Sequence, residues 1–307
     1  MYADVIRARF PKDRRIAAVS DIHGNLDLFR ALLDKIGYGE NDILILIGDL
    51  CNKGEQNEET LEYIMTLARR EDVYVLRGNG DLPRAWMTPA QRAFIESLPH
   101  ILETPEYIFV HAALSDAPID RQDAEQCMKC YNFIEKAGCF DKWVVTGHWP
   151  VANYCHRIPS QDPFFDAEKK IVGIDGGCVV RWDGQLNALL IENGSFSFDF
   201  VDDYPRYTAP HAQAQSGGTL HITYEDRRVE LLEKRGRLNT IRHLKTGTVL
   251  RVPDWAIYEN EEGKLCGGSG ATDFFLPVEE GETLGLVYRE GDLLFLKKGR
   301  TVGWYLE

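Results

Sequence analysis

The chain has 307 residues, 44% hydrophobic content and a net charge of −13, a composition typical of a globular protein long enough for two domains. The acidic charge argues against nonspecific binding to nucleic acid or anionic membranes, and no apolar stretch is long enough to span a bilayer. Seven cysteines, an odd number, favour reduced thiols over a disulfide framework. The first ten residues lack the apolar core of a signal peptide, so we predict a cytoplasmic protein.

The first two thirds of the chain alternate expected strands and helices. Continuous apolar runs of about five residues predict buried strands, and apolar spacing of three and four predicts helices. In chain order, the expected elements are strand Ile16–Ser20, helix Leu26–Ile36, strand Ile43–Ile47, helix Glu58–Arg70, strand Val73–Leu76, helix Pro89–Ser97, strand Ile108–Val110, a helical pattern over Ala124–Ala137, and strand Trp143–Thr146.

A β-rich part follows within the same predicted domain. Its expected strands are separated by glycine-containing turns, as in an antiparallel meander. They are Ile171–Ile174, Val179–Trp182, Leu186–Ile191 and Phe196–Phe200. The order of elements predicts an α/β domain over residues 1–204, built as two packed sheets flanked by helices.

Residues 205–218 have the composition of a linker, and residues 219–307 are predicted to form a small all-β module. Short strands with turn signals recur there without a convincing helix. The expected strands are His221–Tyr224, Val229–Glu233, Thr248–Val252, Phe274–Pro277, Leu284–Tyr288, Leu293–Lys297 and Trp304–Leu306. The ending loosely resembles the close of bacterial SH3-like domains, which suggests a barrel. The partner of this module is unknown.

Five short polar motifs each follow an apolar run, where a strand should end. In α/β sheets the carboxyl ends of neighbouring strands meet at one edge, so the motifs can present their side chains to one place. Two carboxylates, three imidazoles and one carboxamide suit a pair of divalent cations of intermediate hardness. We therefore predict a dinuclear metal hydrolase. The alternative is that these residues are unrelated polar residues at strand ends and histidines of the core. That would require five such motifs to follow five apolar runs by chance. The six candidate ligands are Asp21, His23, Asp49, Asn79, His111 and His148.

These motifs resemble those of the calcineurin-like metallophosphoesterase superfamily, in particular the branch of serine/threonine protein phosphatases and bacterial diadenosine polyphosphate hydrolases. The resemblance covers roughly the first 200 residues. The matching segments are Asp21-Ile22-His23-Gly24-Asn25, Gly48-Asp49-Leu50-Cys51-Asn52-Lys53-Gly54, Leu76-Arg77-Gly78-Asn79-Gly80-Asp81, Val110-His111-Ala112-Ala113-Leu114 and Gly147-His148-Trp149-Pro150-Val151. The match is extended by Ile174-Asp175-Gly176-Gly177-Cys178 and Gly184-Gln185-Leu186-Asn187-Ala188-Leu189.

The resemblance implies a ligand set and a mechanism. Asp49 would bridge two ions and, with Lys53 and Asn79, would be a catalytic residue. Asp21 and His23 would complete the first ion's site, and Asn79, His111 and His148 the second. A metal-bound hydroxide would attack phosphorus in line. Mn²⁺ is the expected ion, with Fe or Zn²⁺ as alternatives.

The chain departs from the protein phosphatases at an acid–base pair. Those relatives carry an Asp that orients a His, and the His protonates the leaving oxygen; here the positions hold Asn52 and Gly80. A phosphoserine alkoxide needs that proton, whereas an anhydride or aryl ester leaves as a weaker base. We therefore expect a preference for diesters or phosphoanhydrides. Asp81 and His156 could replace the acid, although a structural role is favoured for each.

The sequence does not identify which basic residue of the predicted domain would contact the phosphate of a substrate. Arg77 is expected to order its loop. Relatives have a phosphate-binding Arg in the interval that here contains Arg121 and Lys129, and neither can be aligned with it.

Three functions remain open at this point. The favoured one is a metal-dependent phosphoesterase acting on nucleotide-like diesters or anhydrides. The alternatives are a serine/threonine-type protein phosphatase, and a regulatory protein that keeps the metals with little turnover. The expected partner is a phosphorylated small molecule, a nucleotide or a phosphoprotein, with nucleic acid only as a substrate and no membrane.

Overall fold

The computed structural model describes all 307 residues and contains two compact units, each described here by itself. The first comprises Met1–Val151, Asp162–Val180 and Gly184–Asp202, and the second Ala152–Gln161, Arg181–Asp183 and Asp203–Glu307. The predicted boundary at residue 204 and the linker to residue 218 stay predictions. None of the helices combines the length and hydropathy needed to cross a membrane.

One sheet of the first unit carries the central parallel strands, in the order β11-β10-β2-β3-β4. Strands β2, β3 and β4 are parallel neighbours, and β10 runs antiparallel to β2 and β11. The bounds are β2 Ile16–Val19, β3 Ile43–Ile47, β4 Val73–Leu76, β10 Leu186–Glu192 and β11 Ser195–Val201. All five strands were predicted.

The other sheet has the order β1-β5-β6-β7-β9-β8. Its β6, β7 and β9 are parallel to one another. The bounds are β1 Val5–Arg7, β5 Ile101–Glu103, β6 Tyr107–Val110, β7 Trp143–Thr146, β8 Phe164–Asp166 and β9 Ile171–Gly173. The sequence predicts β6, β7 and β9 but not the three-residue strands β1, β5 and β8.

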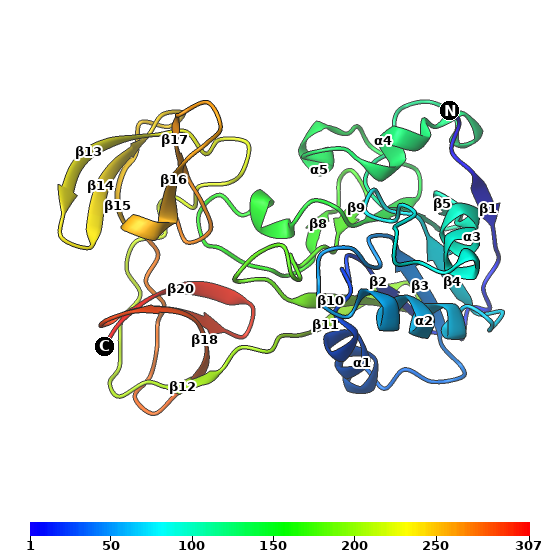
Figure 1. Cartoon of the computed structure of the whole chain (residues 1–307), viewed down its shortest axis with the longest axis horizontal. Helices are drawn as coiled ribbons and strands as arrows, with labels where there is room; N and C mark the ends of the chain where they lie inside the picture. Colours follow the sequence, from blue (N-terminus) through cyan, green and yellow to red (C-terminus); the bar gives the residue numbers. More distant parts are fainter. The chain divides into compact units, whose positions relative to one another are not determined.

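Alternating side chains of β3 build the two apolar layers of this unit. Ile43, Ile45 and Ile47 pack in one buried cluster with residues of β6 and β7 in the other sheet, while Leu44 and Leu46 face the helices. Helices α1 (Leu26–Lys35), α2 (Asn57–Leu67) and α3 (Pro89–Ser97) contribute to the second cluster. Figure 1 shows α1 and α2 beside these strands. The predicted two-sheet arrangement with flanking helices is therefore present.

Two predictions in this region are wrong. Val179–Trp182 forms turns instead of a strand, since Val179 has a φ of 64°, in the left-handed region that a strand excludes. The helical pattern over Ala124–Ala137 is broken into α4 (Ala124–Met128) and α5 (Phe133–Lys136), because Asn132 takes a φ of 57°. Three short 3-10 helices complete the chain: η1 Ile119–Arg121, η2 Val151–Tyr154 and η3 Asp254–Ala256.

The second unit is all-β apart from short 3-10 turns and contains three sheets, ordered β12-β18-β19-β20, β13-β14-β15 and β16-β17 (Figure 1). The bounds are β12 Arg206–Thr208, β13 Val229–Arg235, β14 Leu238–His243, β15 Val249–Pro253, β16 Ile257–Glu259, β17 Leu265–Gly267, β18 Thr283–Glu290, β19 Leu293–Lys298 and β20 Thr301–Leu306. Strand β12 lies in the predicted linker, where it pairs with β18. His221–Tyr224 and Phe274–Pro277 make only isolated bridges, so these two strand predictions are wrong. An SH3-like barrel stays a prediction.

Candidate metal centre

Backbone hydrogen bonds join the loops that follow the parallel strands. Asp21 N donates to Gly48 O at 3.1 Å and His23 N to Asp49 O at 2.9 Å, so the loops after β2 and β3 are tied together. Gly147 N donates to His111 O at 2.9 Å, which ties the loops after β7 and β6. Neighbouring strand ends thus hold the predicted motifs against one another, as the sheet geometry requires.

The six predicted ligands converge at these loops. Asp21, Asp49 and His111 each offer a ligand atom within 4.8 Å of the others. His23 Nε2 lies 3.8 Å from both Asp21 Oδ1 and Asp49 Oδ2. Two further predicted ligands join them, because Asn79 contacts His111 and the ring of His148 lies 5.2 Å from that of His111.

The tautomer of His111 indicates what lies between these groups. Its Nδ1 is 2.7 Å from Ile47 O, and a carbonyl only accepts, so in the neutral imidazole this nitrogen carries the hydrogen. The lone pair of Nε2 then faces Asn79 Oδ1 at 3.2 Å and Asp49 Oδ1 at 3.5 Å. In this tautomer none of the three atoms donates a hydrogen to the others, and such a set of acceptors suits a cation.

The backbone of the site is strained where it carries these side chains. Asp21, His23, Asp49 and His148 have φ values of 57°, 52°, 50° and 65°, in the left-handed region that non-glycine residues rarely adopt. Each such residue costs about 1–3 kcal/mol. Strain at four of the six candidate ligands is typical of a functional site.

Burial shapes the charges of the cluster. Asp21 and Asp49 are 1% and 2% exposed. Burial and then the Asp49 charge raise the pKa of Asp21 well above its ordinary value. Burial also acts to raise the pKa of Asp49, but His111 and His23 lower it on balance. Burial lowers the pKa of His23 to about 4, so this imidazole is neutral near pH 7.

The donor set fits the divalent ions that the motifs imply. His23 Nδ1 and His148 Nε2 are buried polar atoms without a hydrogen-bond partner. Burial, and then His111, lower the pKa of His148 to about 3, which leaves its ring neutral and able to ligate. Neutral imidazoles beside two buried carboxylates satisfy the ligand preferences of Mn²⁺, Fe or Zn²⁺.

The position of the missing acid is closely bordered by Asp49 and Asn52. Gly80 N donates to Asp49 Oδ1 at 2.6 Å, and a Cβ added at Gly80 would lie 2.9 Å from that oxygen and 3.3 Å from Asn52 Nδ2. Asp81, the next residue, has both carboxylate oxygens engaged. Its carboxylate accepts from Leu50 N at 2.9 Å and from Gly78 N at 2.8 Å, so it joins the loops after β3 and β4.

The basic residues divide into two groups. Lys53 and Lys129 are exposed and lie close enough to the centre to contribute to the lowered pKa of His148. Arg77 donates from Nε to Asp81 O at 3.2 Å and orders its loop, and Arg121 lies in η1 on the exposed surface. Of Arg121 and Lys129, Lys129 is therefore the one with an electrostatic effect on the centre.

His156 lies outside the unit that carries the motifs, whereas Tyr131 contacts one of their side chains. His156 belongs to the second unit, where its carbonyl accepts from His221 N. Tyr131, which the sequence did not single out, stacks on His148 with ring centroids 5.8 Å apart and is 46% exposed. Its loop has no metal-binding motif, so only the fold could reveal it.

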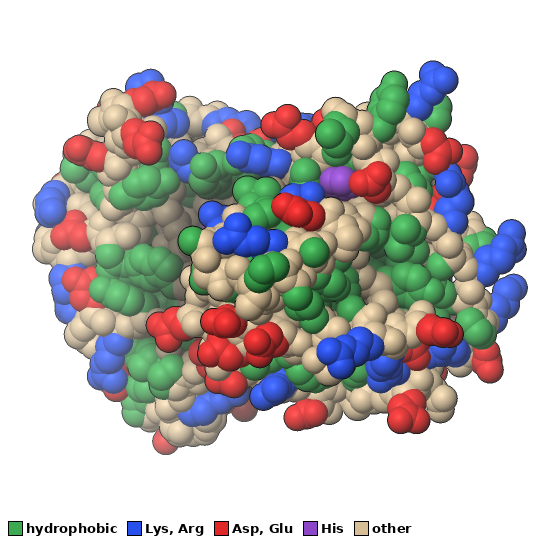
Figure 2. Space-filling model, turned by 45° about the vertical axis from the view of Figure 1, so that its right-hand side comes forward, with side chains coloured by type: hydrophobic (Ala, Val, Ile, Leu, Met, Phe, Trp, Pro, Cys, Tyr) green, Lys and Arg blue, Asp and Glu red, His purple; other side chains and the backbone are tan.

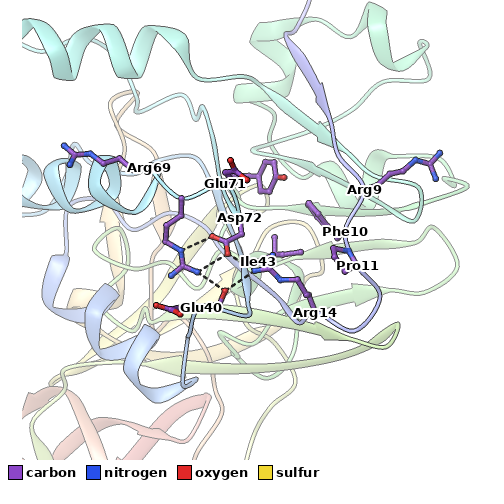
Figure 3. Close-up of a pocket in the computed structure, with 11 residues that line it drawn as sticks. Arg9, Phe10, Pro11, Arg14, Glu40, Ile43, Arg69, Glu71 and Asp72 are labelled. Carbon is purple, nitrogen blue, oxygen red and sulfur yellow. Dashed lines mark hydrogen bonds and ion pairs between the residues drawn. The ribbon is translucent and has the colours of Figure 1, made fainter.

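A cavity of about 640 Å³ lies elsewhere in the first unit, at the amino ends of β3 and β4 (Figure 3). Arg14 and Arg70 both pair with Asp72, at 2.7 Å and 2.9 Å, while Arg9 and Arg69 point away from it. Arg14 and Arg70 also donate to backbone carbonyls. The two inward-facing guanidinium groups are therefore engaged within the fold, at the sheet edge opposite to the candidate centre.

We expect Asp72→Asn to lower the free energy of unfolding by about 1–2 kcal/mol at pH 7. Arg70 holds the pKa of Asp72 at about 2, below its ordinary 3.8, with Arg14 as a second partner. Because that pKa is lowered in the folded state, the contribution is complete above about pH 4 and is lost as the pH falls toward 2. Urea unfolding between pH 2 and 7 measures it, with Glu40→Gln on the same rim as the control. Parallel pH curves for the wild type and Asp72→Asn would contradict this prediction.

Mn²⁺ is expected to raise the melting temperature of the metal-free protein by about 5–10 °C at one hundred times its dissociation constant. Asp21→Asn should abolish this shift because a ligand is lost. The same change should raise the melting temperature of the metal-free protein at pH 8, since Asp21 is buried beside the Asp49 carboxylate. Scanning calorimetry with and without EDTA measures both effects. A full Mn²⁺ shift in Asp21→Asn would exclude Asp21 as a ligand.

Comparison with known proteins places these motifs in a family. Residues 14–177, just over half of the chain, match the calcineurin-like phosphoesterase family. The symmetrical bis(5'-nucleosyl)-tetraphosphatase of Pseudomonas syringae pv. syringae is 41% identical over 177 residues, which are 57% of this chain and 58% of that protein. The enzyme of the same name from Pseudomonas fluorescens is 34% identical over 175 residues, which are 56% and 58% of the two chains.

The matched part is thus less than two thirds of the length of these relatives. Among solved structures, a candidate diadenosine tetraphosphatase is 21% identical with a TM-score of 0.53, over 66% of this chain and all of that one, which shows a shared fold. The family match and the fold agree with the motifs from which the resemblance was drawn. The chain belongs to the calcineurin-like phosphoesterase family.

Proposed function

We propose that the chain is a dinuclear metal-dependent phosphoesterase that favours phosphodiesters or phosphoanhydrides of the nucleotide type. The observation that carries this proposal is the convergence of the six motif side chains on one buried centre. Asp49 is assigned as the bridging ligand, because its oxygens face His23 on one side and His111 on the other. Mn²⁺ is the assigned ion, with Fe or Zn²⁺ as alternatives.

The chain's own residues bind and orient a phosphate group. Lys53 and Lys129 add positive charge beside the centre, which attracts an anionic substrate. Asn79 offers a carboxamide whose Oδ1 is directed at His111, so its amide nitrogen remains for a phosphoryl oxygen. When bound, two divalent cations supply Lewis-acid stabilisation of phosphoryl oxygens and lower the pKa of water to near neutrality.

The absence of a general acid at Gly80 affects which leaving groups can depart. Gly80 has no side chain, and both oxygens of the neighbouring Asp81 accept backbone N–H groups. Without a proton donor at this point, an alkoxide leaving group meets a higher barrier than a phosphate or a phenolate. This supports anhydrides and activated diesters over phosphoserine.

The comparisons and the surface support a small nucleotide-like substrate. The two bacterial relatives named above are hydrolases of bis(5'-nucleosyl) tetraphosphates. On the face drawn in Figure 2, basic and acidic side chains are interspersed, with no broad basic surface for a nucleic-acid backbone. Nucleic acid therefore enters the proposal only as a substrate whose phosphates reach the centre. The cytoplasmic location stays a prediction.

The test is Mn²⁺-dependent hydrolysis of bis-p-nitrophenyl phosphate and of diadenosine tetraphosphate by the full chain. We expect both to be hydrolysed, and EDTA to stop both reactions. Efficient hydrolysis of a phosphoserine peptide instead would support the protein phosphatase alternative. The absence of metal-stimulated hydrolysis on all three substrates would favour the binding protein.

A further inference from the structure

We infer that Arg84, held by Asn52, binds the phosphate that departs when the chain hydrolyses a phosphoanhydride. This inference rests on the proposed function and assigns the part of the centre that selects the leaving group. Arg84 lies on the loop between β4 and α3, five residues after the candidate ligand Asn79, and no metal-binding motif includes it.

The contacts of Arg84 place its guanidinium at the edge of the centre. Its Nη2 donates to Asn52 Oδ1 at 2.8 Å. Its Nε is buried and has no hydrogen-bond partner. A buried guanidinium nitrogen without an acceptor costs free energy, and the partly exposed remainder of the guanidinium can meet an anionic ligand.

Asn52 connects this guanidinium to the Gly80 backbone beside Asp49. A guanidinium only donates, so the contact fixes the carboxamide with Oδ1 toward Arg84 and Nδ2 on the other side. That Nδ2 lies 3.3 Å from the position of a Cβ on Gly80, and Asp49 Oδ1 lies 2.9 Å from the same point. One carboxamide therefore separates Arg84 from Gly80 and from the candidate bridging ligand.

The backbone of Asn52 is arranged to present this carboxamide. Its φ of 122° is rarely adopted by a residue with a side chain, and its N–H donates to Asn57 Oδ1 at 2.5 Å. Asn57 in turn donates to Gly54 O at 2.7 Å, which closes the loop. Strain that neighbouring hydrogen bonds maintain is typical of residues with a positioning role.

The charge of Arg84 is left available for a ligand. Arg14 and Arg70 are neutralised by Asp72, whereas Arg84 forms no ion pair and its partner Asn52 carries no charge. An aspartate at position 52 would form a bidentate ion pair with the guanidinium and remove that charge. The carboxamide holds the guanidinium in place without neutralising it.

This arrangement suits a leaving group that is itself a phosphate. A water oxygen forms a bond to the attacked phosphorus as the bridging P–O bond breaks, and the bond's electron pair stays on the departing phosphate with the bridging oxygen. The proton of water is released to solvent. A departing phosphate monoester has a second pKa of about 6, so it needs a cation rather than a proton near pH 7. Arg84 supplies that cation where a general acid is absent.

The test compares Arg84→Gln with the wild type on two substrates, using the Mn²⁺-loaded full chain. Diadenosine tetraphosphate releases a phosphate leaving group, and bis-p-nitrophenyl phosphate releases a phenolate that carries none. We expect kcat/KM to fall about 30–100-fold on the first and less than about 3-fold on the second. Arg84→Lys keeps the positive charge but lacks the planar guanidinium with its paired donors. Its kcat/KM should fall about 3–10-fold on the first substrate alone.

Arg92→Gln is the matched control. Arg92 donates to Ala85 O and Met87 O on the same segment, without contact to Asn52, so it reports on loop order alone. Equal losses on the two substrates in Arg84→Gln, or the same selective loss in Arg92→Gln, would overturn the inference. An unchanged kcat/KM on both substrates would also overturn it.

Binding of methylenediphosphonate, which cannot be hydrolysed, gives a readout apart from turnover. Calorimetry should show at least about 10-fold weaker binding in Arg84→Gln than in the wild type, while inorganic phosphate binds both alike. If the wild type hydrolyses bis-p-nitrophenyl phosphate but binds the diphosphonate no better than the variant does, this inference fails and the proposed function stands. If the wild type hydrolyses neither substrate, the proposed function fails, and the role of Arg84 fails with it.

Discussion

Replacing Asp49 by asparagine is expected to reduce hydrolysis of bis-p-nitrophenyl phosphate by about 10³-fold or more. Asp49 is 2% exposed, its Oδ1 accepts from Gly80 N, and its two oxygens face His111 and His23. Asparagine keeps the size of the side chain but loses the charge and one acceptor oxygen. Because the bridging carboxylate belongs to both predicted sites, both ions should bind more weakly.

Steady-state kinetics in Mn²⁺ measures this effect, and Asp34→Asn on the exposed side of α1 is the control. Asp49→Asn should retain the circular dichroism of the wild type, since Gly80 N can still donate to the carboxamide oxygen. Activity within 10-fold of the wild type would exclude a bridging role for Asp49.

A preference of at least about 10²-fold for the diester or the dinucleotide over a phosphoserine peptide is the second large effect that we expect. General acids contribute roughly 10²–10⁴-fold, and alkoxide departure depends on them most. Gly80 and Asn52 remove the pair that would protonate an alkoxide, while Asp81 is occupied by two backbone N–H groups. The ratio of kcat/KM values for the three substrates, in one buffer and at one Mn²⁺ concentration, gives the result.

The dependence of the rate on the pKa of the leaving group distinguishes a missing general acid from a site that a peptide cannot enter. In a series of aryl phosphodiesters, the rate should fall steeply as the pKa of the leaving phenol rises, because no acid offsets the charge on the leaving oxygen. A flat dependence, or a peptide hydrolysed as fast as the diester, would require a proton donor that this centre does not present.

The sequence predicted the long strands, and the loops after them that carry the candidate ligands, better than it predicted the short strands. Continuous apolar runs such as Ile43–Ile47 form buried parallel strands. Polar motifs that follow such strands lie close together, because the carboxyl ends of parallel strands lie on the same side of the sheet. The three-residue strands β1 and β5 have no periodicity of their own and depend on pairing with distant residues. Val179 has an apolar strand-forming side chain, yet the tight turn gives it a left-handed φ.

The residues around the centre were harder to predict because their roles depend on tertiary contacts. Arg84 comes near the second motif only because the loops after β3 and β4 are held together by Asp81. Tyr131 reaches His148 from the break between α4 and α5, which the sequence shows as one helical pattern. In the second unit, Trp255 packs against Tyr288 and Trp304, while the expected strands His221–Tyr224 and Phe274–Pro277 are irregular segments with isolated bridges.

The number of Mn²⁺ ions bound per chain distinguishes a dinuclear centre from a site for a single ion. We expect two ions by calorimetric titration of the metal-free protein, together with the electron paramagnetic resonance spectrum of a spin-coupled pair. Coupling is expected because Asp49 faces the ligands of both predicted sites. A single bound ion with an uncoupled spectrum, or no binding at micromolar Mn²⁺, would contradict the assignment of the six side chains to a dinuclear centre.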